Sequence, residues 1–226
     1  MLEGEKLDFF NKIIDLSIFI LDIHGKKILS TSEIHRAFHI MFDKNNEKIE
    51  EFFAECSKAL TIYISSDEYI DRGDNHIYEN FKEKYGDAMK YITKLLKRKN
   101  KKIRRTVPAY LSNALLNIAN DDLTTDMDMT NNKTFDNIVR ISMYCHKLYN
   151  EYKIITPDML KISLGILFGD NIIHDKCMSS IDEFSRTKIT QLKHYGDVQK
   201  IAEKYKLKIS KKTMMYLCTL YENIIQ

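Results

Sequence analysis

Two short stretches of the sequence combine cationic side chains with hydroxyl groups, which are residue types that bind phosphate. Residues 94–105, KLLKRKNKKIRR, contain eight cations and no acid, and Thr106 follows them directly. Residues 26–31, KKILST, place two lysines ahead of Ser30 and Thr31. Lysine and arginine neutralise phosphate groups, and hydroxyl groups donate hydrogen bonds to them. A cationic run alone is more often a solvated surface or a localisation signal. Its sequence context therefore has to show whether it binds phosphate.

The charge of the chain is localised along its length. Residues 1–80 carry 9 basic and 16 acidic side chains, a net charge of −7, whereas residues 81–105 carry 11 and 2, a net charge of +9. The whole chain has a formal net charge of only +3. Binding of a polyanion depends on where the cations lie more than on their sum. This distribution therefore favours a localised surface for nucleic acid.

The sequence offers little support for catalysis or for binding of a cofactor or metal. It has no glycine-rich phosphate loop and no nucleophile paired with a base, so we expect a protein that is not an enzyme and that needs no cofactor. We also expect no metal site, because Asp126 and Asp128 begin a calcium-like pattern that Asn131 interrupts. Three histidines are predicted to be surface residues: His24, His35 and His39. Four scattered cysteines are predicted to be free thiols: Cys56, Cys145, Cys177 and Cys218.

The elements that carry these residues are predicted to be helices. The sequence has only two prolines and seven glycines in 226 residues, and its 44% hydrophobic content is enough for a core. Apolar periodicity predicts helices over residues 6–23, about 31–43, 47–64, 85–98, from 109 onwards, 135–152, 157–167 and, as a short and a long helix, within 198–225. Residues 65–80 are predicted to be a linker, and residues 121–134 a mobile surface insertion. The fold class is therefore all-α.

Local signals place several helix starts. Ser30 stands three residues before Glu33, which is the spacing of a capping box. Thr156 precedes Pro157, a pair that suits an N-cap and a first helical position. Ser210 is predicted to cap the last helix. Pro108 suits the first turn of the helix that follows the cationic run.

No apolar run approaches the roughly 18 residues that a membrane span needs. The first residues, MLEGEKLDFF, lack the order of a signal peptide. We therefore expect a soluble, intracellular protein with no membrane partner.

At four places the sequence resembles core histones. Residues 8–38 look like the second half of the central helix, the second loop and the third helix of histone H-two-B, and residues 51–66 look like its C-terminal helix. Residues 92–116 are similar to the first helix, first loop and central-helix start of histone H-two-A, and residues 150–164 to its second loop and third helix. An H-two-B-like half followed by an H-two-A-like half is the order of the fused histone doublets of giant DNA viruses.

This resemblance implies two fused histone folds that form an intramolecular handshake pair. In such a pair the first loop of one fold lies beside the second loop of the other, and these paired loops grip DNA phosphates. Arg104 and Arg105, with Arg36 as a weaker candidate, would enter minor grooves, as histone arginines do in the nucleosome. The expected DNA-binding residues are Lys26, Lys27, Ser30, Thr31, Arg36, Lys94, Lys97, Arg98, Lys99, Lys101, Lys102, Arg104, Arg105, Thr106, Lys153, Lys208, Lys211 and Lys212.

The resemblance divides the chain into three segments. Residues 1–80 would be an H-two-B-like fold without its first helix, residues 81–180 an H-two-A-like fold with the 121–134 insertion, and residues 181–226 a C-terminal helical segment. This segment resembles the start of a histone fold. It could supply the missing piece, as in a circular permutation, begin a third partial histone, or form a helical hairpin on the core.

Two further departures bear on partners. The acidic patch of histones is poorly kept, because Leu167, Phe168 and Gly169 stand where acids should be and only Glu55 clearly matches. The lysine modified near the end of the H-two-B C-terminal helix is replaced by Ile62, and there is no long basic tail. Proteins that dock on the patch are therefore expected to bind weakly.

The resemblance implies a structural function: non-sequence-specific binding and compaction of double-stranded DNA in a nucleosome-like particle. The implied partner is an H-four/H-three-like doublet, and a second copy of the chain could join. The implied location is the host nucleus or a cytoplasmic viral factory, and the virion. Two alternatives remain: a histone-fold transcription or replication factor subunit, and a histone-fold interaction module that caps a particle.

Overall fold

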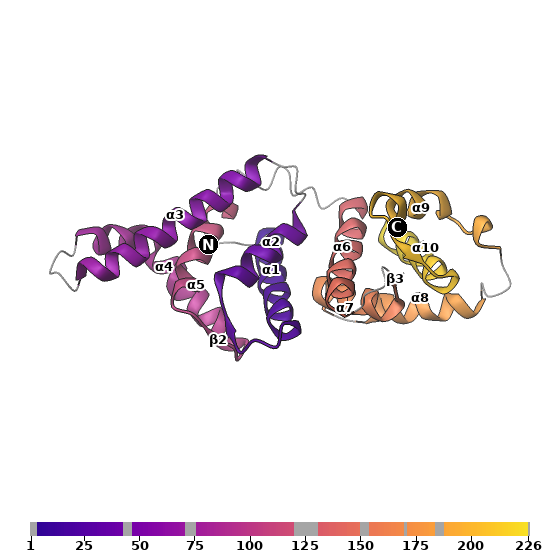
Figure 1. Ribbon diagram of the computed structural model, residues 1–226, viewed down its shortest axis with the longest axis horizontal. Coiled ribbons are helices and arrows are strands. Elements are labelled where there is room, and N and C mark those ends of the chain that lie inside the picture. The colour runs from indigo at the N-terminus through magenta and orange to yellow at the C-terminus, as the bar shows by residue number, and fades with distance from the viewer. Residues whose placement is uncertain are drawn as a thin grey trace. The chain divides into compact units, whose positions relative to one another are not determined.

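The computed structural model describes residues 4–42, 47–70, 76–119, 131–149, 154–169, 171–183 and 188–225. Over these residues the chain is mostly helical, which confirms the all-α prediction (Figure 1). It divides into two compact units, Met1–Met127 and Asp128–Gln226. The predicted segment boundaries at residues 80 and 180 fall inside these two units. The division of the chain into an H-two-B-like and an H-two-A-like fold therefore stays a prediction that rests on the resemblance.

The first unit contains five helices and two very short strands in its described part. Their bounds are α1 Gly4–Ile23, β1 Ile28–Leu29, α2 Thr31–Met41, α3 Glu47–Ile70, α4 His76–Arg98, β2 Lys102–Ile103 and α5 Thr106–Ala119. Helix α1 packs on α2, α5 packs on both α3 and α4, and α3 packs on α4. The strand β1 pairs in parallel with β2, across more than seventy residues of sequence.

The second unit repeats this order of elements. Its bounds are α6 Asn131–Tyr149, β3 Ile154–Ile155, α7 Pro157–Phe168, α8 Ile172–Glu183, the 3₁₀ turn η3 Ile189–Gln191, α9 Tyr195–Lys204, β4 Lys208–Ile209 and α10 Lys211–Ile225. Helix α6 packs on α7, and α10 packs on both α8 and α9. The strands β3 and β4 again form a parallel pair. Apart from η3, each unit is therefore a helix, a strand, three helices, a strand and a helix.

The two units also share their pattern of buried side chains. Phe10 and Phe135 occupy equivalent places on α1 and α6 and are both fully buried. Ser17 and Ser142 follow at the same spacing, and each buried hydroxyl donates to the carbonyl four residues earlier, at 2.7 and 2.8 Å. Further equivalent buried pairs are Ile13 with Ile138, Ile14 with Val139, Leu16 with Ile141, and Ile20 with Cys145. The structure therefore contains an internal repeat, of which the sequence predicted only the likeness of residues 198–225 to the start of a histone fold.

The loops that precede β2 and β4 also match. Asn100 ends α4 with a φ of +53°, and Lys206 follows the end of α9 with a φ of +52°. Each residue stands two positions ahead of its strand, and each backbone N–H bonds back to the helix, Asn100 to Lys97 O and Lys206 to Glu203 O. A left-handed residue reverses the chain at a helix end. In both units it turns the chain toward the neighbouring strand in the same way.

The predicted caps are confirmed. Ser30 and Glu33 form the capping box of α2. The Thr156 side chain accepts the backbone N–H of Met159 at the start of α7, and Pro157 occupies the first turn. The Ser210 hydroxyl accepts the Thr213 N–H of α10 at 3.1 Å. These signals are local, so they do not depend on how the units pack.

Several predicted bounds were wrong. Residues 65–70 continue α3 and residues 76–80 begin α4, so the predicted linker at 65–80 is largely helical. A polar and acidic composition is compatible with a helix, so composition alone did not identify a linker here. Helix α5 begins at Thr106 rather than Ala109, and α6 begins at Asn131, so residues 131–134 are helical. Residues 120–130, with the calcium-like pattern, lie outside the described residues.

Candidate nucleic-acid interface

The loop of β1 and the loop of β2 lie side by side in the first unit, which confirms the predicted pairing of these two loops. Ile28 stands beside Lys102 and Leu29 beside Ile103. The register is extended by the Arg104 backbone N–H, which donates to Leu29 O at 2.9 Å. Leu29 is fully buried whereas Ile28 is 48% exposed. Leu29 anchors the loop pair, while Lys27 on its own loop and Lys102 and Arg104 on the neighbouring loop are exposed.

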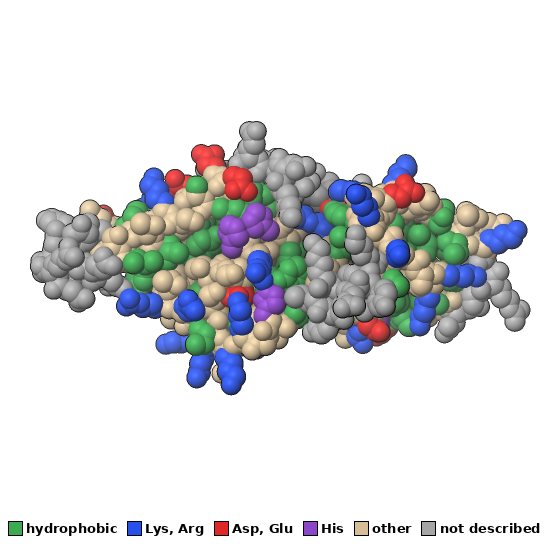
Figure 2. Space-filling view, viewed as in Figure 1, with side chains coloured by type: hydrophobic (Ala, Val, Ile, Leu, Met, Phe, Trp, Pro, Cys, Tyr) green, Lys and Arg blue, Asp and Glu red, His purple; other side chains and the backbone are tan. Residues whose placement is uncertain are grey.

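Two helices begin at this loop pair. Helix α2 starts at Thr31, directly after β1, and α5 starts at Thr106, directly after β2. The N-terminus of a helix carries a partial positive charge and free backbone N–H groups, which favour anions. Figure 2 shows Lys and Arg side chains gathered on the first unit at the end where Figure 1 labels β2. The N-termini of α2 and α5 and the Lys and Arg side chains therefore lie at the same surface of the first unit.

Three predicted DNA-binding lysines are held by acids of their own unit. Lys26 pairs with Glu33 at 2.7 Å. Lys99 pairs with Asp15 at 2.6 Å, and Lys101 pairs with Asp22 at 2.5 Å, so the loop before β2 is tied to α1. A cation that already neutralises a neighbouring acid contributes less to binding of phosphate. These lysines position the loops, and their positive charge is locally compensated.

Glu33 is the centre of the first of these contacts. Its side chain is inaccessible to solvent. The Ser30 backbone N–H and hydroxyl both donate to its carboxylate, at 3.0 and 2.6 Å. Burial alone would raise the pKa of this carboxyl, but the hydrogen bonds from Lys26 and Ser30 lower the pKa to about 2. The Ser30 hydroxyl, predicted to contact DNA, thus donates inside the protein.

A second set of cations at the loop pair remains exposed. Lys27, Lys102 and Arg104 are exposed and have no acidic partner within the described part of the chain. Arg105 is also exposed, and Thr31 and Thr106 are half-buried. The Arg36 guanidinium lies on α2, 3.2 Å from the His24 ring. Lys27, Lys102 and Arg104 therefore carry most of the uncompensated positive charge of this surface.

The second unit has an equivalent loop pair. Ile154 stands beside Lys208 and Ile155 beside Ile209. The Thr213 hydroxyl of α10 donates to Ile155 O at 3.0 Å, which joins the helix start to the neighbouring loop. Three of the predicted DNA-binding cations are exposed on the β4 side: Lys208, Lys211 and Lys212. Lys153, predicted on the β3 side, lies outside the described residues.

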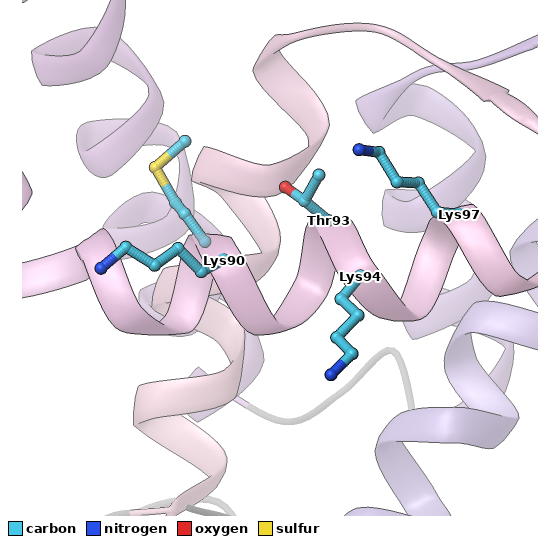
Figure 3. Close-up of a pocket in the computed structure, with 5 residues that line it drawn as sticks. Lys90, Thr93, Lys94 and Lys97 are labelled. Atoms are coloured by element: carbon cyan, nitrogen blue, oxygen red, sulfur yellow. The ribbon is translucent and has the colours of Figure 1, made fainter.

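The remaining predicted cations lie along α4. Lys94, Lys97 and Arg98 are exposed on its last two turns. A shallow hollow on this helix is lined by Met89, Lys90, Thr93, Lys94 and Lys97. Figure 3 shows that these side chains come from successive turns of one helix and extend in different directions. They do not converge on one ligand atom, so this face suits diffuse attraction of a polyanion rather than a defined pocket.

The thiols and histidines differ in how well the predictions hold. All four cysteines are free, as predicted, and all four are also buried. Burial raises the pKa of each thiol to about 12, so these thiols stay protonated near neutral pH. The surface prediction for His35 and His39 was too simple, because both are half-buried against Phe53. No described helix is long and apolar enough to cross a membrane.

Comparison with protein-family models, with curated proteins and with solved structures gave no match.

Proposed function

We propose that the protein is a histone doublet that binds and compacts double-stranded DNA without reading its sequence. The observation that carries this proposal is the parallel pairing of two loops at the starts of two helices, present once in each unit, with exposed cations at β1 and β2 of the first unit and at β4 of the second. Exposed cations and helix N-termini that act on one surface attract phosphate at any sequence. The residues around β1 and β2 are those that resemble the second loop of H-two-B and the first loop of H-two-A.

The internal repeat supports a permuted arrangement of the two histone folds. Each unit holds the second half of one central helix, α1 or α6, and the first half of the other, α5 or α10. The C-terminal segment supplies β4 as the partner of β3, which is the role that a first loop of H-two-B would have. In this proposal α10 precedes α1 in the H-two-B-like fold.

The structure also departs from a continuous histone fold. Helix α5 ends at Ala119 and α6 begins at Asn131, and the two helices belong to different compact units. The resemblance implies that they form the two halves of one central helix. The proposed particle, with an H-four/H-three-like doublet as partner, therefore requires the two units to associate as the halves of one handshake pair.

The salt dependence of DNA binding tests the proposal. We expect a triple variant, K27A/K102A/R104A, to bind random-sequence duplex DNA with a slope of log Kd against log salt smaller by about 2.7, because each lost phosphate contact removes about 0.9. The matched control, K58A/K82A/K200A, removes three exposed lysines that pair with acids one helical turn away. Its slope should be almost unchanged. Equal slopes for the two variants would contradict the proposed interface.

An interaction module that caps a particle is the second candidate. The acids that pair with Lys26, Lys99 and Lys101 favour an interaction module, because they reduce the positive charge that this surface presents to DNA. This function predicts tight binding to the H-four/H-three-like doublet with weak DNA binding. Analytical ultracentrifugation of the two doublets, with and without a DNA duplex, distinguishes the two functions.

A further inference from the structure

Helix α2 carries two histidines one helical turn apart whose side chains meet. His35 and His39 stand at positions i and i+4, so they share one face of the helix. Their Nε2 atoms are 2.9 Å apart, while their ring centroids are 4.5 Å apart. The two nitrogens are therefore on the facing edges of the rings. The rings stand at 73° to each other.

The surrounding side chains hold both rings in place. The His35 ring lies 4.0 Å, and the His39 ring 4.6 Å, from the ring of Phe53 on α3. The Tyr110 hydroxyl of α5 lies 3.3 Å from His35 Nδ1. Burial raises the pKa of Tyr110 well above its usual range, so its oxygen remains a neutral hydroxyl. A partner on the second ring nitrogen is what orients a metal-binding histidine and fixes its tautomer.

We propose that His35 and His39 form a two-histidine site for a divalent transition metal with tetragonal geometry, such as Cu²⁺. An imidazole nitrogen binds such a metal at about 2.0–2.1 Å, so two nitrogens at a right angle are about 2.9 Å apart. Tetrahedral coordination would separate them by about 3.3 Å. The 2.9 Å contact is a hydrogen bond between the two rings, which a bound metal would replace, and its length matches the right angle of tetragonal coordination.

The remaining coordination positions are open to solvent. Both histidines are half-buried, and histidine side chains reach the surface of the first unit (Figure 2). Among the described residues there is no group of three or more histidines, cysteines or acids that could hold a metal, so water would complete the coordination. With the metal on Nε2, the His35 Nδ1–H donates to the Tyr110 oxygen. The site joins two turns of α2, so an occupied site stabilises this helix.

Electron paramagnetic resonance of the full chain with one equivalent of Cu²⁺ tests the site. We expect a tetragonal spectrum with hyperfine splitting from two imidazole nitrogens, and an upward shift of the melting temperature. H35Q and H39Q should each lose the two-nitrogen spectrum and the shift. The matched control is H24Q, because His24 is also half-buried and contacts Arg36 but has no second histidine beside it. This variant should bind as the original chain does.

Circular dichroism of each variant shows whether it is folded, and Y110F provides a second test that keeps both ligands. Y110F removes the oxygen that orients His35, so we expect it to retain the two-nitrogen spectrum with about tenfold weaker binding. Copper binding that persists with the same spectrum in H35Q or H39Q would overturn the proposal. So would a spectrum of the original chain that shows no imidazole nitrogen.

Discussion

Replacing Glu33 with glutamine tests how the first loop pair is built. Glutamine has nearly the same shape, but it cannot pair with Lys26 as an ion. The pKa of Glu33 falls from 4.5 to about 2 on folding, and one pKa unit corresponds to about 1.4 kcal/mol. The upper limit of the stabilisation by the charged form is therefore about 3.4 kcal/mol. Because the amide oxygen can still accept a hydrogen bond from Ser30, we expect a loss of about 2 kcal/mol.

The sign of the pH dependence follows from the lowered pKa. A carboxyl whose folded pKa is depressed stabilises the fold above its unfolded pKa, and this stabilisation is lost as pH falls toward the folded pKa. The difference between the original chain and E33Q should thus be largest at pH 7. Between pH 7 and pH 3.5 the stabilisation by the charged form falls by about 1.4 kcal/mol, so a deficit of about 2 kcal/mol should fall to about 0.6 kcal/mol at pH 3.5 and decrease further toward pH 2.

Urea unfolding, followed by circular dichroism at pH 7, 5 and 3.5, measures this difference. E55Q is the matched control, because Glu55 is exposed and lies 3.5 Å from Lys58. An exposed pair of this kind contributes little, so E55Q should change the free energy of unfolding by less than about 0.5 kcal/mol. If E33Q were as stable as the original chain at pH 7, or if its deficit did not change with pH, the assigned role of Glu33 would be refuted.

Two further predictions concern the second unit. S210A should destabilise this unit by about 1 kcal/mol in urea unfolding, because the N-cap of α10 loses its acceptor for the Thr213 N–H. The control is S179A, which removes an exposed hydroxyl that donates to the Asp175 carbonyl within α8 and should have little effect. A peptide that reads the histone acidic patch should bind weakly in a pull-down, because Leu167 is buried and Gly169 caps α7 with a φ of +77°, a conformation in which an acidic side chain is strained; host-like affinity would contradict this.

The sequence predicted features that depend on a few neighbouring residues. The capping box at Ser30 and Glu33 and the start of α7 at Thr156 are local, and they are present in the structure. The pairing of the loops at β1 and β2 was predicted only through the histone resemblance. Periodicity alone contains no information about two strands separated by more than seventy residues.

Other features could not be predicted because they depend on distant contacts. Lys99 and Asp15 are 84 residues apart in sequence, so nothing in the cationic run shows that this lysine is already paired. The repeat was hidden because loops of different length change the spacing between equivalent residues. Phe10 and Phe135 are separated by 125 positions, but Tyr110 and Tyr216 by 106. The available signals were two short likenesses: KILS at 27–30 with KIIT at 153–156, and NKKIRR at 100–105 with KLKISK at 206–211.

Reconstitution on DNA is the most direct test of the proposed function. The purified protein would be dialysed from high salt onto random-sequence DNA, with and without an H-four/H-three-like doublet, and then digested with nuclease. The proposal predicts a discrete protected fragment that requires both proteins and that shortens with K27A/K102A/R104A but not with K58A/K82A/K200A. Tight binding between the doublets without any protected fragment would contradict it and favour an interaction module.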